Sequence, residues 1–175
     1  ALFRLGAKLH RRDLLSVIDN GATFRTQKRR RRGARRATKA GFQVSELDNI
    51  DVFWPILEQR LLHAHRTRPT HTAEEILILK KRFPTAIRLF VCGNGNAIMG
   101  GVVIFETERV AHVQYIAAND EGLAAGVLDL LFFHLIEEVY RNKRYFDFGH
   151  SNIPDGGDLN FGLVEQKEGF GARAS

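Results

Sequence analysis

The sequence predicts a mixed α/β fold built on a central sheet, and three observations support this prediction. Residues 87–91, 98–106 and 110–117 are apolar or alternating segments between turn-forming residues, which is typical of consecutive strands in a β-meander. Residues 123–142 carry two lines of apolar side chains at helical spacing, wide enough for a helix packed against a sheet. Residues 145–148 read as a strand soon afterwards, and this order indicates a right-handed β-α-β crossover.

The segments before the meander are predicted as three helices and one strand. Residues 1–24 show no clear period and are expected to be the trailing piece of something larger. Residues 26–40 are predicted as a short helix, and residues 42–47 as a half-buried strand. A longer helix is expected over residues 49–65. The next helix begins at residues 72–75, a capping box in which a Thr hydroxyl and a Glu carboxylate satisfy two free amides reciprocally.

The chain is divided at residue 41 into a basic lead-in and a main domain. Residues 25–39 carry nine Lys and Arg side chains and no acidic one, so the formal net charge of +6 becomes −3 when these nine are set aside. Residues 1–41 are therefore expected to be a linker left from a preceding domain. Residues 42–175 form the main domain, which continues after the crossover strand with a helix over residues 159–168 and the start of a further strand.

Composition restricts the classes of protein and site. The single cysteine, Cys92, allows neither a disulfide framework nor a thiolate zinc site within the chain, and the histidines lack metal-ligand spacing. No apolar run approaches the roughly 20 residues that a membrane-spanning helix needs. The sequence therefore predicts a cytoplasmic protein without a membrane span and without a metal site.

The order of elements resembles that of the GNAT superfamily of N-acyltransferases, over about residues 42–175. Several stretches are also similar to the FemAB-type proteins, in which two such domains stand in tandem. They are RRRRGARRATKAGFQVSE, FWPILEQRLLHAHRTRPTHTAEEILILKKRFP, HVQYIAANDEG, YFDFGHSN and LNFGLVEQKEGFGARA. The resemblance implies a GNAT-like fold and acyl transfer to a small-molecule or peptide amine. It also implies a preceding GNAT-like domain or a homodimer as a partner.

The resemblance leaves two donors open. GNAT enzymes usually hold the cofactor pyrophosphate on a Gly-rich turn before the helix that follows the fourth strand. Residues 119–126 occupy that position, but Asp120 and Glu121 place negative charge where the phosphates would lie. The donor implied is therefore acetyl-CoA or another acyl-CoA, or the aminoacyl-tRNA that FemAB-type proteins use. The donor contacts that the resemblance implies are Ile116, Ala117, Ala118, Gly122 and Gly126.

Four residues are predicted to line the reacting centre: His112, Tyr115, Asp147 and Ser151. Imidazole suits a general base at neutral pH, and a phenol can protonate a leaving group. Asp147 stands between two Phe residues and precedes a polar turn at a strand end, where ligands bind in α/β sheets. Alternation along the strand predicts His112 on one sheet face and Tyr115 on the other.

Each of these candidates also has a structural interpretation. A lone strand histidine is commonly a hydrogen-bonded structural residue, Tyr115 can be a core aromatic, and Asp147 can cap the turn. Lys167, on the last predicted helix, is interpreted as a salt-bridge residue.

The basic segment supports a second hypothesis, a catalytically inert GNAT-like module. In this case Arg29–Arg36 would bind RNA or a diphosphate through salt-dependent phosphate contacts. The alternative is a solvated interdomain helix, and the aromatic side chains that stack on single-stranded bases are missing from the segment.

Overall fold

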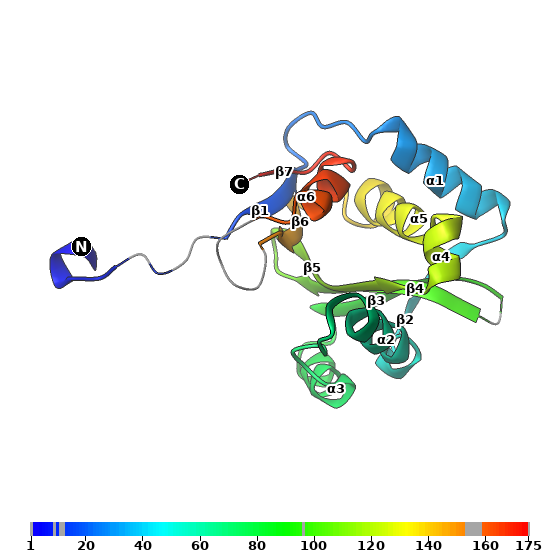
Figure 1. Cartoon of the computed structure of the whole chain (residues 1–175), viewed down its shortest axis with the longest axis horizontal. Coiled ribbons are helices and arrows are strands. Elements are labelled where there is room, and N and C mark those ends of the chain that lie inside the picture. The colour runs from blue at the N-terminus through cyan, green and yellow to red at the C-terminus, as the bar shows by residue number, and fades with distance from the viewer. Residues whose placement is uncertain (1, 9, 11–12, 96, 153–158, 175) are drawn as a thin grey trace.

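A mixed β-sheet with helices on both faces forms the centre of the protein (Figure 1). The computed structural model describes residues 2–8, 10, 13–95, 97–152 and 159–174, so Ser175, the end of the predicted last strand, lies outside it. The helical segments are η1 (Leu2–Leu5), α1 (Lys28–Lys39), η2 (Ile50–Val52), α2 (Trp54–His65), α3 (Ala73–Arg82), α4 (Asp120–Ala125), α5 (Val127–His134), the π-helical η3 (Leu135–Val139) and α6 (Phe161–Glu168). The strands are β1 (Leu15–Asp19), β2 (Gln43–Leu47), β3 (Ile87–Asn94), β4 (Ala97–Glu106), β5 (Val110–Ala118), β6 (Tyr145–His150) and β7 (Arg173–Ala174).

The strand order of the sheet confirms the predicted fold class. Among the described residues the order is β2-β3-β4-β5-β6-β1-β7. Neighbours from β2 to β5 pair antiparallel, which is the predicted β-meander. β5 and β6 pair in parallel and are connected through α4, α5 and η3, which is the predicted β-α-β crossover. The capping box at Thr72 and Glu75 is formed as predicted, with both reciprocal hydrogen bonds present.

Each face of the sheet carries its own hydrophobic core. On one face, called here the α5 side, α5 packs beside α1 and α6 over aromatic residues that include Phe132 and Phe146 (Figure 1). On the other face, called the α2 side, α2 and α3 cover a second core that contains Trp54, Ile76 and Tyr115. The two cores explain why the meander strands are buried on both faces and read as nearly continuous apolar runs.

β1 is a strand that the sequence did not predict. Residues 1–24 show no clear period and were expected to be the trailing piece of something larger, but Leu15–Asp19 lies between β6 and β7 and pairs antiparallel with both. The segment has five residues, of which only Ser16 and Ile18 are buried. Two inward positions are too few for an alternating pattern to stand out from the surrounding polar residues.

The long helix predicted over residues 123–142 is divided into α4, α5 and η3. Gly126 ends α4 with a left-handed φ of 87°, and α5 starts at the next residue. A Cβ at Gly126 would lie 2.7 Å from the carbonyl oxygen of Gly33 in α1. The break therefore has a packing role, because it allows the backbone of α1 to approach closely.

Two further observations concern membranes and metals. No helix in the part of the chain that the structure describes is long and apolar enough to cross a bilayer. The same residues contain no group of three or more His, Cys, Asp or Glu side chains arranged to hold a metal ion. Cys92 is fully buried, and this burial raises the pKa of its thiol to about 11.

Replacing Gly126 is expected to destabilise the protein more than replacing Gly41, which has a similar φ of 84° but open space around its Cβ position. Gly41→Ala should lower the free energy of unfolding by about 1 kcal/mol through backbone strain alone. Gly126→Ala adds the clash with Gly33 and should lower it by about 2–4 kcal/mol. Urea unfolding of both variants measures the difference, and equal losses would contradict a packing role for Gly126.

Candidate active site

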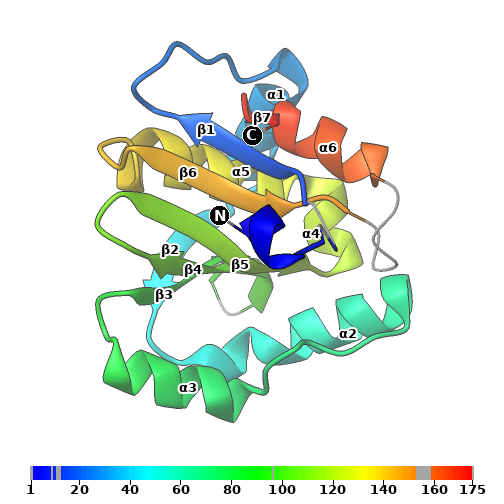
Figure 2. The same ribbon diagram turned by 90° about the vertical axis from the view of Figure 1, so that its left-hand side faces the viewer.

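The parallel pairing of β5 and β6 ends after three residue pairs, the last of which joins His112 to Asp147. Beyond this pair β5 continues to Ala118 along β4 alone, while β6 continues to His150 along β1 (Figure 2). The two strands therefore separate toward their carboxyl ends. The edge of residues 113–118 that faces β6 has no strand partner among the described residues, so its backbone groups are available to a ligand. This opening is called the β5–β6 gap below.

A β-bulge at Gln114 determines which side chains of β5 face the α2 side. Val113 and Tyr115 pair with adjacent residues of β4, so Gln114 is an extra residue in β5. Val113 belongs to the core on the α5 side, whereas Tyr115 belongs to the core on the α2 side. The prediction that His112 and Tyr115 lie on opposite faces is therefore wrong, because the bulge shifts the alternation by one residue.

His112 and Asp147 form a hydrogen-bonded pair at the start of the gap. Nδ1 of His112 lies 2.8 Å from Oδ2 of Asp147, and Oδ1 of Asp147 accepts a hydrogen bond from the Gly149 amide. Burial raises the pKa of Asp147, but the hydrogen bonds from His112 and Gly149 outweigh it, so the net shift is downward. An ionised carboxylate only accepts hydrogen bonds, so Nδ1 carries the proton and Nε2 is left as the acceptor. The imidazole is 35% exposed and can meet a ligand.

Lys167 of α6 reaches the end of β6 at the same gap. Its Nζ donates hydrogen bonds to the carbonyl oxygens of Gly149 and His150 and to Oγ of Ser151. Burial lowers the pKa of Lys167 to about 8, against the opposing attraction of Asp147. Ser151 is fully buried at this contact. The structure therefore places Ser151 beside Lys167 rather than next to the imidazole of His112.

A cavity of about 50 Å³ lies on the α5 side of the gap, next to Lys167. Ile116, one of the predicted donor contacts, forms part of its wall. The volume suffices for one or two water molecules and no more. Its lining consists of Val113, Ile116, Phe132, Phe148, Leu163, Gln166, Lys167 and Phe170.

Tyr115 connects the loop between α2 and α3 to the sheet. Its hydroxyl lies 2.6 Å from Nδ1 of His71 and accepts a hydrogen bond from the His71 amide at 3.2 Å. The ring packs edge-on against Trp54, with 5.3 Å between centroids. Tyr115 is 8% exposed, so its hydroxyl anchors this loop.

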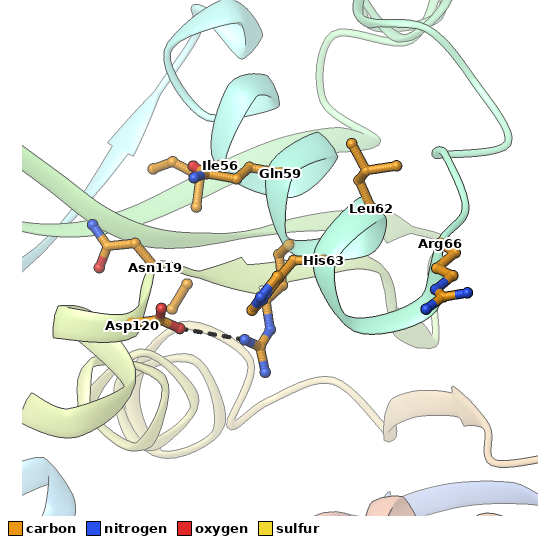
Figure 3. Close-up of a pocket in the computed structure, with 9 residues that line it drawn as sticks. Ile56, Gln59, Leu62, His63, Arg66, Asn119 and Asp120 are labelled. Atoms are coloured by element: carbon orange, nitrogen blue, oxygen red, sulfur yellow. Dashed lines mark hydrogen bonds and ion pairs between the residues drawn. The ribbon is translucent and has the colours of Figure 1, made fainter.

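A pocket of about 800 Å³ lies between α2 and the start of α4 (Figure 3). Arg60, His63 and Arg66 contribute basic side chains from α2 and its end. Across the pocket are Ala118, a predicted donor contact, and Asp120, which pairs with Arg60 at 3.5 Å. The remaining lining residues are Ile56, Gln59, Leu62 and Asn119. The acidic start of α4 therefore faces the basic side chains of α2 across the pocket. The sequence of residues 119–126 alone does not indicate these basic neighbours.

One amide at the start of α4, that of Gly122, already has a hydrogen-bond partner within the protein. Oδ1 of Asn119 accepts the hydrogen bond of the Gly122 amide at 2.7 Å. Gly122 is required for close packing, because a Cβ there would lie 2.6 Å from the carbonyl oxygen of Met99. Gly126 stands at the far end of α4 against α1, and Ala117 is buried in the core on the α2 side. Of the five predicted donor contacts, only Ala118 lines the large pocket.

The sequence analysis missed two features of this site. Lys167 was interpreted as a surface salt-bridge residue, and nothing local in the sequence indicates its burial against β6. Arg66 is the one residue other than glycine with a positive φ, 52°, among those described, so its backbone is strained at the rim of the pocket. The Arg-Thr-Arg-Pro sequence of residues 66–69, which follows α2, indicates that a helix ends there, but it does not indicate a pocket.

The lowered pKa of Lys167 predicts a specific dependence of stability on pH. The ordinary value is 10.5 and the folded value is about 8, so folding favours the neutral amine and the wild type gains stability as pH rises from about 8 to 10.5. Lys167→Met lacks this gain. The melting temperature of Lys167→Met relative to the wild type should therefore be highest below pH 8 and fall above it. The difference amounts to at most about 3 kcal/mol, and less with solvent screening.

The exposed Lys81 of α3 provides the control, since Lys81→Met should show no such change with pH. Thermal unfolding of the three proteins between pH 6 and 10 is the measurement. Parallel curves for the wild type and Lys167→Met would show that the amine of Lys167 titrates as it does in water.

Comparison with known proteins identifies the fold and the family. Curated protein sequences give no match to this chain. Among solved structures, FemX has a TM-score of 0.76 at 11% identity, covering 94% of this chain and 60% of its own. The C-terminal domain of a protein described as a lysylphosphatidylglycerol synthetase from Agrobacterium fabrum has a TM-score of 0.67 at 14% identity, with coverage of 98% and 60%. L-PGS from Bacillus licheniformis has a TM-score of 0.62 at 13% identity, with coverage of 93% and 58%.

The chain thus spans about 60% of the length of these structures, and at such low identity they show a shared fold. The sequence model of the acetyltransferase (GNAT) domain matches residues 24–159. This match covers well over half of the chain, and the chain accordingly belongs to the GNAT acetyltransferase domain family.

Proposed function

We propose that this GNAT domain transfers an acyl group, an aminoacyl group in the first instance, from a phosphate-bearing donor to an amine at the β5–β6 gap. The observation that carries the proposal is the His112–Asp147 pair, which stands at the point where the two strands separate. Lys167 adds a partly buried amine at the same gap, on the α5 side of the sheet. A general base, a cation and a free strand edge are what acyl transfer to an amine requires.

In the proposed reaction the acceptor amine attacks the carbonyl carbon of the donor ester or thioester. A C–N bond forms, and the C–O or C–S bond of the donor breaks. Nε2 of His112 accepts the proton that the amine loses, and Asp147 stabilises the resulting imidazolium. The negative charge on the carbonyl oxygen is stabilised by the free amides of β5, while Lys167, whose three N–H groups hold the end of β6, contributes only its nearby charge. The proton then passes to the leaving oxygen or sulfur.

The pocket between α2 and α4 favours an aminoacyl-tRNA donor over the usual mode of CoA binding. The Gly122 amide, which would contact a pyrophosphate, is already bonded to Asn119, and Asp120 adds negative charge. Arg60 and Arg66 offer phosphate contacts that do not depend on those amides. The FemAB-type proteins that the sequence resembles use this donor.

An acyl-CoA donor is the second candidate, since it is the usual donor in the family. The phosphates of the CoA would have to bind the same basic side chains of the pocket, Arg60 and Arg66. The alternative to an enzyme, an inert module that holds RNA through Arg29–Arg36, is tested by the same experiments, because it predicts RNA binding without transfer.

Loss of the base is expected to lower the rate of transfer with little change in stability. His112→Gln should lower kcat about 100-fold or more, and Asp147→Asn should lower it as well, because Nδ1 loses its anionic partner. His134→Gln is the matched control, since His134 ends α5 and its Nδ1 pairs with Glu138 of η3 at 2.8 Å, away from the gap. The measurement is transfer of a labelled amino acid from aminoacyl-tRNA, and of acetyl from acetyl-CoA, to a panel of small amines and lysine peptides.

If the wild type transfers from either donor but His112→Gln is as active as His134→Gln, His112 is not the base. If no transfer occurs with either donor while RNA binds in a salt-dependent way, the inert module replaces the enzyme.

A substitution of Arg66 can separate an effect on donor affinity from an effect on the stability of the fold. Arg66→Gly removes a cation from the pocket and also relieves the left-handed strain, so the protein should gain up to about 1 kcal/mol of stability. Its affinity for the true donor should fall about tenfold, the usual effect of losing one charged hydrogen bond. Thermal unfolding with and without aminoacyl-tRNA or acetyl-CoA measures both quantities. Unchanged affinity in a stable variant would remove Arg66 from the donor site.

A further inference from the structure

A second surface, on the outer side of α1 and α5, combines basic side chains with an apolar floor. α1 packs along α5, and a groove of about 420 Å³ lies between their exposed sides. We call this surface the basic groove. It is lined by Arg31, Ala34, Arg35, Thr38, Lys39, Leu130 and Phe133.

The fold uses three cations of α1 internally. Arg29 pairs with Glu165, and Arg30 pairs with Asp129 at 2.9 Å. Nε of Arg36 donates a hydrogen bond to the carbonyl oxygen of Ala125. These three side chains attach α1 to α4, α5 and α6, although Arg29 and Arg36 remain exposed.

The other cations of α1 form a stripe on its exposed side. Lys28, Arg31, Arg35 and Lys39 follow one another at intervals of three or four residues, and Arg32 lies beside them. All five are exposed, and none makes an ion pair with any residue that the structure describes. At about 1.5 Å per residue the stripe is about 16 Å long. The nearest acidic neighbours on α5 and η3 are Asp129, which pairs with Arg30, Glu138, which pairs with His134, and Glu137.

The floor of the groove is apolar. Leu130 and Phe133 of α5 are only partly buried, and Ala34 lies between them and the cations. RNA could cover such a floor only with bases, and successive bases stack on several aromatic side chains, whereas Phe133 is the one aromatic residue among those that line this groove. A phospholipid surface presents phosphates and acyl chains together, and basic helices with an apolar side bind such surfaces.

We propose that the basic groove docks the protein on an anionic phospholipid bilayer. The phosphates lie along the stripe from Lys28 to Lys39, and acyl segments contact Leu130 and Phe133. This docking is independent of acyl transfer, because the groove shares no residue with the His112–Asp147 pair or with the pocket between α2 and α4.

The test is co-sedimentation of the whole chain with vesicles of phosphatidylcholine containing 0% or about 30% phosphatidylglycerol. Binding is expected only with the anionic lipid. Arg31→Gln/Arg35→Gln should weaken it by a factor of about 30, since each basic residue near such a surface contributes about a factor of five. Both side chains are fully outside the core, so the fold is retained, as circular dichroism will show.

Lys81→Gln/Arg82→Gln is the matched control, because it removes the same net charge from α3 on the opposite side of the sheet. It should bind vesicles nearly as the wild type does. Phe133→Gln tests the apolar floor and should make the remaining binding more sensitive to salt. The proposal is overturned if the wild type does not bind anionic vesicles at low salt, or if the two double variants are weakened equally. It is also overturned if the stripe variant loses affinity for bulk tRNA but not for vesicles.

Discussion

The structure of the site depends on the end of the parallel pairing between β5 and β6. Each strand keeps one antiparallel partner beyond that point, β4 for β5 and β1 for β6, so the sheet can open without leaving either strand alone. The residues that follow the last parallel pair in β5 and β6 therefore do not pair with each other. Its two side chains, His112 and Asp147, project to the same side of the sheet and come within hydrogen-bonding distance because of the register.

Aromatic packing and one lysine close the opening on the α5 side. Phe132 lies 5.0 Å from Phe148 and 5.1 Å from Phe170 between ring centroids, and these rings leave a cavity of only about 50 Å³. Lys167 fills the rest of the space and holds the carbonyl groups at the end of β6. Burying an ammonium in such surroundings is unfavourable, and this burial lowers the pKa of Lys167 to about 8.

Features that depend on neighbouring residues in the chain were predictable, and features that depend on distant partners were not. The meander strands, the capping box at Thr72 and the crossover follow from local periods, and His112 and Asp147 were both identified as candidates. β1 pairs with residues about 130 positions away, such as His150 with Leu15, so its short pattern had no local support. The bulge in β5 arises from pairing with β4, and the burial of Lys167 arises from the end of β6. Neither the bulge nor the burial of Lys167 can be predicted from the residues next to it in the sequence.

In the proposed donor site, the groups that could contact phosphate are side chains rather than backbone amides, and this difference bears on the choice of donor. An amide cradle at a helix start fixes a pyrophosphate in one geometry, because each N–H points in a set direction. Here Asn119 occupies that position on Gly122, and the cations come from α2, on flexible side chains across a pocket of about 800 Å³. The guanidinium groups of Arg60 and Arg66 can each bind a phosphate through paired hydrogen bonds, but their long side chains allow this contact at more than one position in the pocket. A site of this kind suits a donor whose orientation is fixed elsewhere by a larger body, such as a tRNA, better than one that relies on the pyrophosphate alone.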